Sequence, residues 1–163
     1  MIAEKKVKVM LIASFPESII TFRGALISAM QDQGLSVHVA APDLRIDSAI
    51  RQTLEKIDVV VHDIPLERTG ANLLSDLGLL WSLVRLLRRI EPDCVIGYTI
   101  KPVIYGSLAA WLASIPHRFA LVTGLGYAFT DNRSGLKTRL VQNLYRFALT
   151  KVQKVFFQNS DDE

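Results

Sequence analysis

The sequence predicts an α/β protein built around a doubly wound, parallel sheet of six strands. First, short apolar runs alternate with longer stretches of helical periodicity along all 163 residues. Second, inner runs such as "CVIG" at 94–97 are continuously apolar, as strands buried on both faces are. Third, a helical stretch separates each pair of runs, and such crossovers make strands parallel. The expected sheet is Rossmann-like, with strand order 3-2-1-4-5-6.

Strand and helix signals alternate in the first half of the chain. The run "VKVMLIA" is rich in β-branched and other apolar residues, which favours a strand, and the helix after it ends where Gly34 allows a left-handed turn. Asp47 or Ser48 supplies the cap of a second, shorter helix. The expected strands are 7–13, 36–42 and 58–65, and the expected helices are 20–33 and 47–56.

The second half continues the alternation with longer helices. Apolar residues recur at steps of three and four from Leu73 to Ile90, which is the stripe of an amphipathic helix. Pro102 suits the first turn of the next helix because it has no amide hydrogen to leave unpaired. The expected strands are 92–99, 117–123 and 154–159, and the expected helices are 73–90, 103–114 and 135–150.

Composition places these elements in one globular domain that spans 1–163. The chain is 50% hydrophobic and 21% charged, which excludes a disordered protein. The single cysteine, Cys94, excludes a disulfide framework, favours a reducing compartment and indicates the cytoplasm. The three histidines show no pair at ligand spacing, so no metal site is expected. The charge-free stretch from Pro102 to Pro116 is shorter than the roughly 20 residues of a membrane-spanning helix.

The candidate ligand site is the carboxyl edge of the sheet, near the switch point between the first and fourth strands. Lys101 lies where the fourth strand meets its helix, so its charge is expected to face a ligand; the alternative is a solvated loop lysine. The "TGLG" glycines either let the backbone approach sugar or phosphate oxygens or form a tight turn. No catalytic residue is assigned. The candidate substrate-binding residues are Ser14, Arg68, Tyr98, Thr99, Lys101, Thr123, Gly124 and Gly126, with Arg23 as a further candidate.

Several ligand classes are disfavoured by missing motifs. The loop after the first strand has no glycine, and position 129 is Phe, so the dinucleotide fingerprint is absent. The sequence has no Walker motif either, so we expect neither NAD nor ATP and no cofactor. The aromatic residues follow packing periods and form no stacking platform, so nucleic acid is not an expected partner.

The helix expected at 135–150 is basic. Six lysines and arginines and no acidic residue lie between Asn132 and Ser160. With its apolar stripes, this helix resembles an interfacial element that contacts an anionic membrane surface. The alternative is a buried stripe with a solvated basic face.

Four segments together resemble the N-terminal domain of a family 4 glycosyltransferase of the GT-B fold. They are "ITFRGALISAMQDQGLSVHVAAP", "GYTIKPVIYGSLAA", "LVTGLGYAFT" and "VFFQNSDD". The resemblance covers essentially the whole chain. These segments resemble bacterial enzymes that build surface polysaccharide or lipid-linked oligosaccharide.

The resemblance implies a metal-independent, retaining transfer of a sugar from a nucleotide donor to an acceptor, often a lipid-linked glycan at the cytoplasmic membrane face. In such enzymes the N-terminal domain shapes the acceptor side, and the C-terminal domain holds the nucleotide. The chain ends at "QNSDDE", where the resemblance places the interdomain linker. The donor-side domain is therefore expected to be absent and the chain alone to be inactive. Two alternatives stay open: a non-catalytic binding or membrane-recruiting subunit of a split GT-B enzyme, and half of a nucleotide-sugar epimerase.

Overall fold

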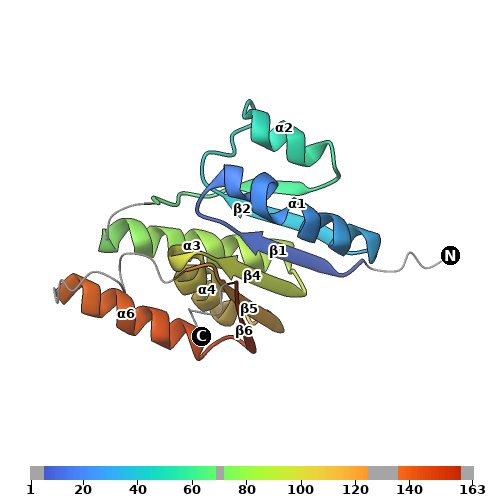
Figure 1. The fold of residues 1–163 in the computed structure, drawn as a ribbon. Coiled ribbons are helices and arrows are strands. Elements are labelled where there is room, and N and C mark those ends of the chain that lie inside the picture. The colour runs from blue at the N-terminus through green and yellow to red at the C-terminus, as the bar shows by residue number, and fades with distance from the viewer. Residues whose placement is uncertain (1–5, 69–71, 125–135, 159–163) are drawn as a thin grey trace.

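The computed structural model describes residues 6–68, 72–124 and 136–158, and it contains a six-stranded parallel sheet (Figure 1). The strand order is β3-β2-β1-β4-β5-β6, which confirms the predicted order. In the central register, Leu11 of β1 lies beside Val39 of β2 and Ile96 of β4. The strands are β1 (Lys8–Ile12), β2 (Ser36–Ala41), β3 (Val60–Asp63), β4 (Cys94–Tyr98), β5 (His117–Val122) and β6 (Lys154–Phe157).

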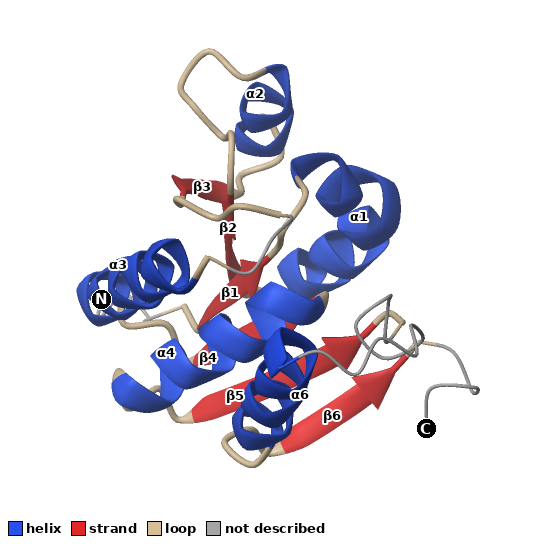
Figure 2. Cartoon of the chain, turned by 90° about the vertical axis from the view of Figure 1, so that its left-hand side faces the viewer, coloured by secondary structure: helices blue, strands red, loops and turns tan. Residues whose placement is uncertain are grey.

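Helices cover the sheet from both sides (Figure 2). The helices α1 (Pro16–Asp32) and α2 (Ala49–Glu55) lie on one face. The other face carries α3 (Leu73–Ile90), the π-helix η1 (Pro102–Gly106), α4 (Ser107–Leu112) and α6 (Leu136–Leu149). Side chains alternate between the two faces along a strand. Met10 of β1 therefore packs in the core under α3 and α4, and Leu11 packs in the core under α1. The doubly wound prediction is therefore confirmed.

Three described helix starts differ from the sequence-based expectation. The helix expected at 47–56 begins at Ala49, because Ser48 is its N-cap. The first helix begins at Pro16 and not at Ile20, because proline fits the first helical turn and Glu17 interacts favourably with the positive end of the helix. The helix expected at 103–114 begins one residue earlier, as a π-helix. Such wide turns are often found at functional sites. This one directs Lys101 and Tyr105 toward the same carboxylate on α3.

A stacked histidine pair joins β2 to β3. Nδ1 of His38 lies 3.0 Å from Nε2 of His62, and the two rings are stacked with centroids 5.3 Å apart. Burial lowers the pKa of His62 to about 4, and positive charge on His38, Arg89 and Arg51 acts in the same direction. Burial, followed by the charge of Lys8, also lowers the pKa of His38. Both rings are therefore neutral near pH 7.

This pair predicts a loss of stability in mild acid. The pKa of His62 in the folded chain lies below its usual value of 6.5. Above about pH 6.5, His62 is therefore neutral in both the folded and the unfolded chain, and the free energy of unfolding does not change with pH on its account. As the pH falls toward 4, the unfolded chain takes up a proton that the folded chain resists. Allowing for solvent screening, we expect His62 to account for about 1–2 kcal/mol of lost stability. Urea unfolding at several pH values measures this loss. A His62→Gln variant with the same pH dependence as wild type would contradict it.

Candidate functional site

Side-chain hydrogen bonds join the loops after β1 and β4. Ser14 Oγ lies 2.7 Å from Thr99 Oγ1, and Ser18 Oγ lies 3.0 Å from the Tyr98 hydroxyl. Ser18 also donates to the carbonyl oxygen of Phe15 at 2.6 Å. Because Ser18 has one hydroxyl hydrogen, the Tyr98 hydroxyl is the donor in their shared bond. The two loops at the switch point therefore form one hydroxyl-bearing cluster.

The backbone at this edge has an uncommon conformation at two predicted residues. Thr99 has a φ of 69°, a left-handed value that costs a β-branched residue about 1–3 kcal/mol. Its carbonyl accepts the first hydrogen bond of η1, from the amide of Val103 at 3.0 Å. Gly124, after β5, has a φ of 134°, which side chains rarely adopt. The positive φ of Gly124 is compatible with both the tight-turn and the close-approach interpretations, and strain at Thr99 is of the kind found at ligand sites.

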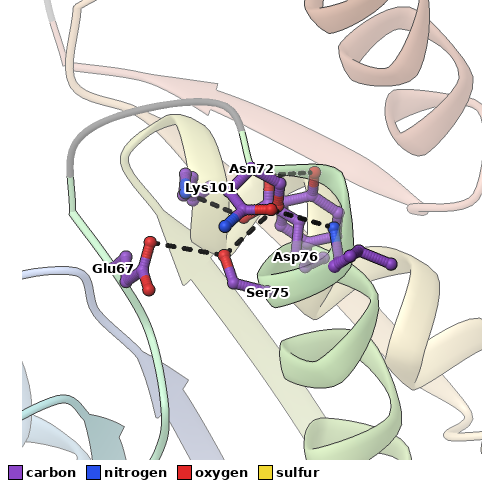
Figure 3. A network of polar contacts seen from close by, with 7 residues as sticks. Glu67, Asn72, Ser75, Asp76 and Lys101 are labelled. Atoms are coloured by element: carbon purple, nitrogen blue, oxygen red, sulfur yellow. Dashed lines mark hydrogen bonds and ion pairs between the residues drawn. The ribbon is translucent and has the colours of Figure 1, made fainter.

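Lys101 is neutralised by a carboxylate that the sequence analysis did not single out (Figure 3). Its ammonium lies 2.8 Å from one oxygen of Asp76, and the hydroxyl of Tyr105 donates to the other at 3.0 Å. The Lys101 and Asp76 side chains are only 12% and 8% exposed. Burial is the main cause that raises the pKa of Tyr105, and the charge of Asp76 adds to it. The ion pair therefore fastens η1 to the first turn of α3.

The same network extends to the loop after β3 (Figure 3). Ser75 contacts Glu67 Oε2 at 3.3 Å and the carbonyl oxygen of Asn72 at 3.2 Å. The side chain of Asn72 caps α3 by accepting the amide hydrogen of Leu74 at 3.2 Å. Polar contacts thus connect the start of α3 to two neighbouring loops of the carboxyl edge.

Arg23 carries a buried positive charge on the α1 side of this edge. The residue is 9% exposed, and its guanidinium donates to the carbonyl oxygen of Phe22 and to Gln158 Oε1, both at 3.1 Å. Its carbon Cζ lies 4.8 Å from the centroid of the Tyr98 ring. Among the described residues, Arg23 pairs with no carboxylate, and its Nε is buried without a hydrogen-bond partner. Arg23 therefore retains donor capacity for an anion.

The structure brings together part of the predicted site. Ser14, Tyr98 and Thr99 belong to one cluster, although Tyr98 is only 2% exposed and joins the cluster through its hydroxyl. Arg68 lies beside this cluster, with Cζ 4.6 Å from the centroid of the Phe15 ring. Lys101 lies on the α3 side with Asp76, and Thr123 follows β5 at the same edge. Gly126 lies outside the described residues.

Sequence reasoning missed Asp76 and Tyr105 as members of these networks, and it placed Ser18 at the carboxyl edge without choosing it as a binding residue. The sequence did contain a signal for Asp76. Asp76 is the only acidic residue between Leu73 and Ile90, and Lys101 is the only charged residue between Gly97 and Pro116, so the two could have been paired. No cluster of metal-ligating side chains occurs within the described ranges. In the same part of the chain, no helix is both long and apolar enough to cross a bilayer.

The fold and the carboxyl edge together define a Rossmann-like domain that carries hydroxyl groups and a buried cation near its switch point. The sequence profile described as glycosyl transferase 4-like matches residues 8–159. The chain belongs to this glycosyltransferase family, as an N-terminal GT-B domain, which confirms the resemblance.

A curated relative is similar to most of the chain. The chain is 31% identical over 141 residues to the N,N'-diacetylbacillosaminyl-diphospho-undecaprenol alpha-1,3-N-acetylgalactosaminyltransferase of Campylobacter jejuni. The aligned region covers 86% of the chain and 35% of the relative. The chain thus spans about a third of that protein's length.

Solved structures show the same fold at lower identity. MurG from Acinetobacter baumannii superimposes with a TM-score of 0.64 at 18% identity, covering 96% of the chain and 42% of MurG. A UDP-N-acetylglucosamine 2-epimerase superimposes with a TM-score of 0.66 at 18% identity, covering 96% of the chain and 43% of the epimerase. At this identity the likeness establishes the fold alone.

Proposed function

We propose that the chain is the acceptor-side domain of a retaining glycosyltransferase. The enzyme moves a sugar from a nucleotide donor to a lipid-linked or polysaccharide acceptor and needs no metal ion. The nucleotide is held mainly by a domain outside these 163 residues. Membership of the glycosyltransferase family supports the transfer of a sugar. The name of the Campylobacter jejuni relative supports an acceptor built on diphospho-undecaprenol. We also propose that the protein works at the cytoplasmic face of a membrane, because such an acceptor is held there by its lipid.

The observation that carries this proposal is the buried guanidinium of Arg23 beside the Tyr98–Ser18 hydrogen bond. A buried arginine is stabilised further by a carboxylate or phosphate partner, and the described residues supply no carboxylate to Arg23. We assign the diphosphate of the acceptor to Arg23, with Arg68 as a second, more exposed cation. Lys101 shares its charge with Asp76, so its role is mainly to position η1.

The hydroxyl groups at the carboxyl edge are suited to orienting the acceptor and not to nucleophilic attack. Ser14 is paired with another hydroxyl, that of Thr99, and an activated serine nucleophile would instead contact a base. Paired hydroxyls donate and accept at the same time, which matches the hydroxyl groups of a sugar. The domain therefore contributes to transfer by binding the acceptor and directing its reacting hydroxyl toward the donor.

This proposal predicts binding without turnover. The purified chain is expected to bind an undecaprenyl diphosphate-linked sugar and to transfer no sugar from a nucleotide donor. Arg23→Met is expected to weaken binding at least about tenfold, because a hydrogen bond to a charged group contributes about 1.5–3 kcal/mol. Arg23→Lys keeps the charge and is expected to lose less. Isothermal titration measures these affinities.

A matched control is Arg45→Met, which removes an exposed arginine just before α2 and is expected to leave binding unchanged. Thermal unfolding of each variant separates lost binding from lost folding. Unchanged affinity in folded Arg23→Met, or sugar transfer by the chain alone, would contradict the proposal. Tight binding of a nucleotide sugar without affinity for the acceptor would instead favour the epimerase alternative.

A further inference from the structure

The two tryptophans of the chain lie on one outer surface, over the helices α3, α4 and α6. Trp81 on α3 is 63% exposed and Trp111 on α4 is 43% exposed. Phe147 of α6 is 46% exposed and meets Trp111 edge-on, with centroids 6.4 Å apart. Arg88 connects α3 to α4 by donating to the carbonyl oxygen of Leu112 at 3.2 Å. We call this surface the α3–α4–α6 face; it comprises Trp81, Arg85, Arg88, Trp111, Phe147 and Lys151.

Basic side chains are interleaved with these aromatic rings. The ammonium of Lys151 lies 4.7 Å from the centroid of Trp111 and 4.7 Å from that of Phe147. Trp81, Val84, Arg85 and Arg88 line an open hollow of about 330 Å³. Long basic side chains with apolar stems, placed beside exposed tryptophan, are the side chains that favour a membrane interface.

The charge of this face has a single sign. The only acidic residue in the sequences of α3, α4 and α6 is Asp76, and it is buried against Lys101. Arg85, Arg88 and Lys151 therefore have no exposed carboxylate on these helices to balance them. In a symmetric dimer this face would meet its own copy and oppose like charges, which disfavours a second copy as the occupant. An anionic surface complements it.

We propose that the α3–α4–α6 face docks on a bilayer that contains anionic phospholipids. The tryptophans and Phe147 enter the headgroup region, and Arg85, Arg88 and Lys151 contact lipid phosphates. The sequence analysis considered the helix at 135–150 alone, whereas the structure adds α3 and α4 to the basic surface. This inference deepens the proposed function, since it rests on an acceptor held in a membrane.

The position of the face suits such an acceptor. α3 begins at the carboxyl edge, where Asp76 holds Lys101, and Trp81 lies little more than one turn further along the helix. Trp81 is thus the part of the face nearest the edge that carries Ser14 and Thr99, whereas Arg88 and Lys151 lie where α3 and α6 end, towards the opposite edge of the sheet. Docking would bring a lipid-held sugar to that edge without releasing its lipid.

Vesicle binding tests the inference through the two tryptophans themselves. With phosphatidylcholine vesicles that contain phosphatidylglycerol, the chain is expected to co-sediment, and its tryptophan emission is expected to shift to the blue. Both signals should weaken on pure phosphatidylcholine and with added salt. Each basic residue near an anionic surface contributes roughly fivefold in partitioning, so Arg85→Glu/Lys151→Glu is expected to reduce binding at least about tenfold.

The matched control is Arg45→Glu/Lys56→Glu, which makes the same change in net charge on exposed residues that flank α2. It is expected to reduce binding far less, and Arg85→Gln/Arg88→Gln provides a second test without reversed charge. Equal losses in both double variants, or unshifted emission on anionic vesicles, would overturn the inference. A dimer in sedimentation that the Arg85→Glu/Lys151→Glu variant abolishes would identify a second copy as the occupant. These vesicles contain no sugar, so the outcome is independent of the acceptor titration.

Discussion

Replacing Asp76 with alanine is expected to lower the free energy of unfolding by about 3–5 kcal/mol. The substitution leaves the Lys101 ammonium, whose side chain is 12% exposed, without its counter-charge. It also removes the acceptor of the Tyr105 hydroxyl. Lys101 and Tyr105 follow β4 on one turn, so η1 would lose its polar attachment to α3. Urea unfolding at pH 7, followed by circular dichroism, measures the change.

The chain provides its own control for the Asp76 prediction. Arg51 and Glu55 form an ion pair 2.7 Å apart on α2, but Glu55 is 46% exposed, and Glu55→Ala is expected to cost less than about 1 kcal/mol. Asp76→Asn/Lys101→Met removes both charges, keeps an acceptor for Tyr105, and is expected to recover most of the lost stability. A double variant as unstable as Asp76→Ala would show that the cost does not come from the unpaired ammonium.

The sheet could be predicted from the sequence because its signals are local and repeated. Each apolar run, such as "VKVMLIA" or "CVIG", is bounded by turn residues, and the crossover rule then leaves few arrangements of the strands. The same reasoning predicted that the residues after β1 and β4 share an edge. The hydrogen bond between Ser14 and Thr99 confirms that proximity, while its use by a substrate stays a prediction.

The partner of Lys101 could not be predicted in the same way. Helical periodicity indicates which side of α3 faces the sheet, but it does not indicate what a long side chain from another helix reaches. Asp76 follows Ser75 and lies outside the apolar stripe of the helix, where an acid is ordinarily solvated. Its burial depends on where η1 meets α3, and this contact is set by the sheet. The available signal was one isolated acid among the residues of α3 and one isolated cation after β4.

The guanidinium of Arg23 illustrates the same limit. Its position on the first helix is local information, but its contacts come from Tyr98 after β1 has paired with β4, and from Gln158 after β5 has paired with β6. Burial of Arg23 therefore follows from the completed sheet. A sequence pattern can nominate such a residue, whereas only the tertiary structure shows that its charge is uncompensated among the described residues.

Gly97→Ala is the second substitution with a large expected effect. A Cβ at Gly97 would lie 2.5 Å from the carbonyl oxygen and 2.9 Å from the carbonyl carbon of Pro102. Both atoms are backbone, so no side chain can rotate away, and η1 must move off β4. We expect a loss of about 3 kcal/mol in the free energy of unfolding, at the upper end of overpacking substitutions. Because Thr99 and Lys101 connect β4 to η1, weaker acceptor binding should accompany the loss.

Gly24→Ala is the matched control for Gly97→Ala. A Cβ at Gly24 meets no atom within 4 Å, and the residue lies inside α1. Alanine there is expected to raise the free energy of unfolding by about 0.5–1 kcal/mol, because glycine is the poorer helix former. The two substitutions are chemically identical, so opposite signs in urea unfolding would isolate the close approach of η1 to β4. If Gly97→Ala were as stable as Gly24→Ala, that approach would not be what positions Lys101 and Thr99 at the edge.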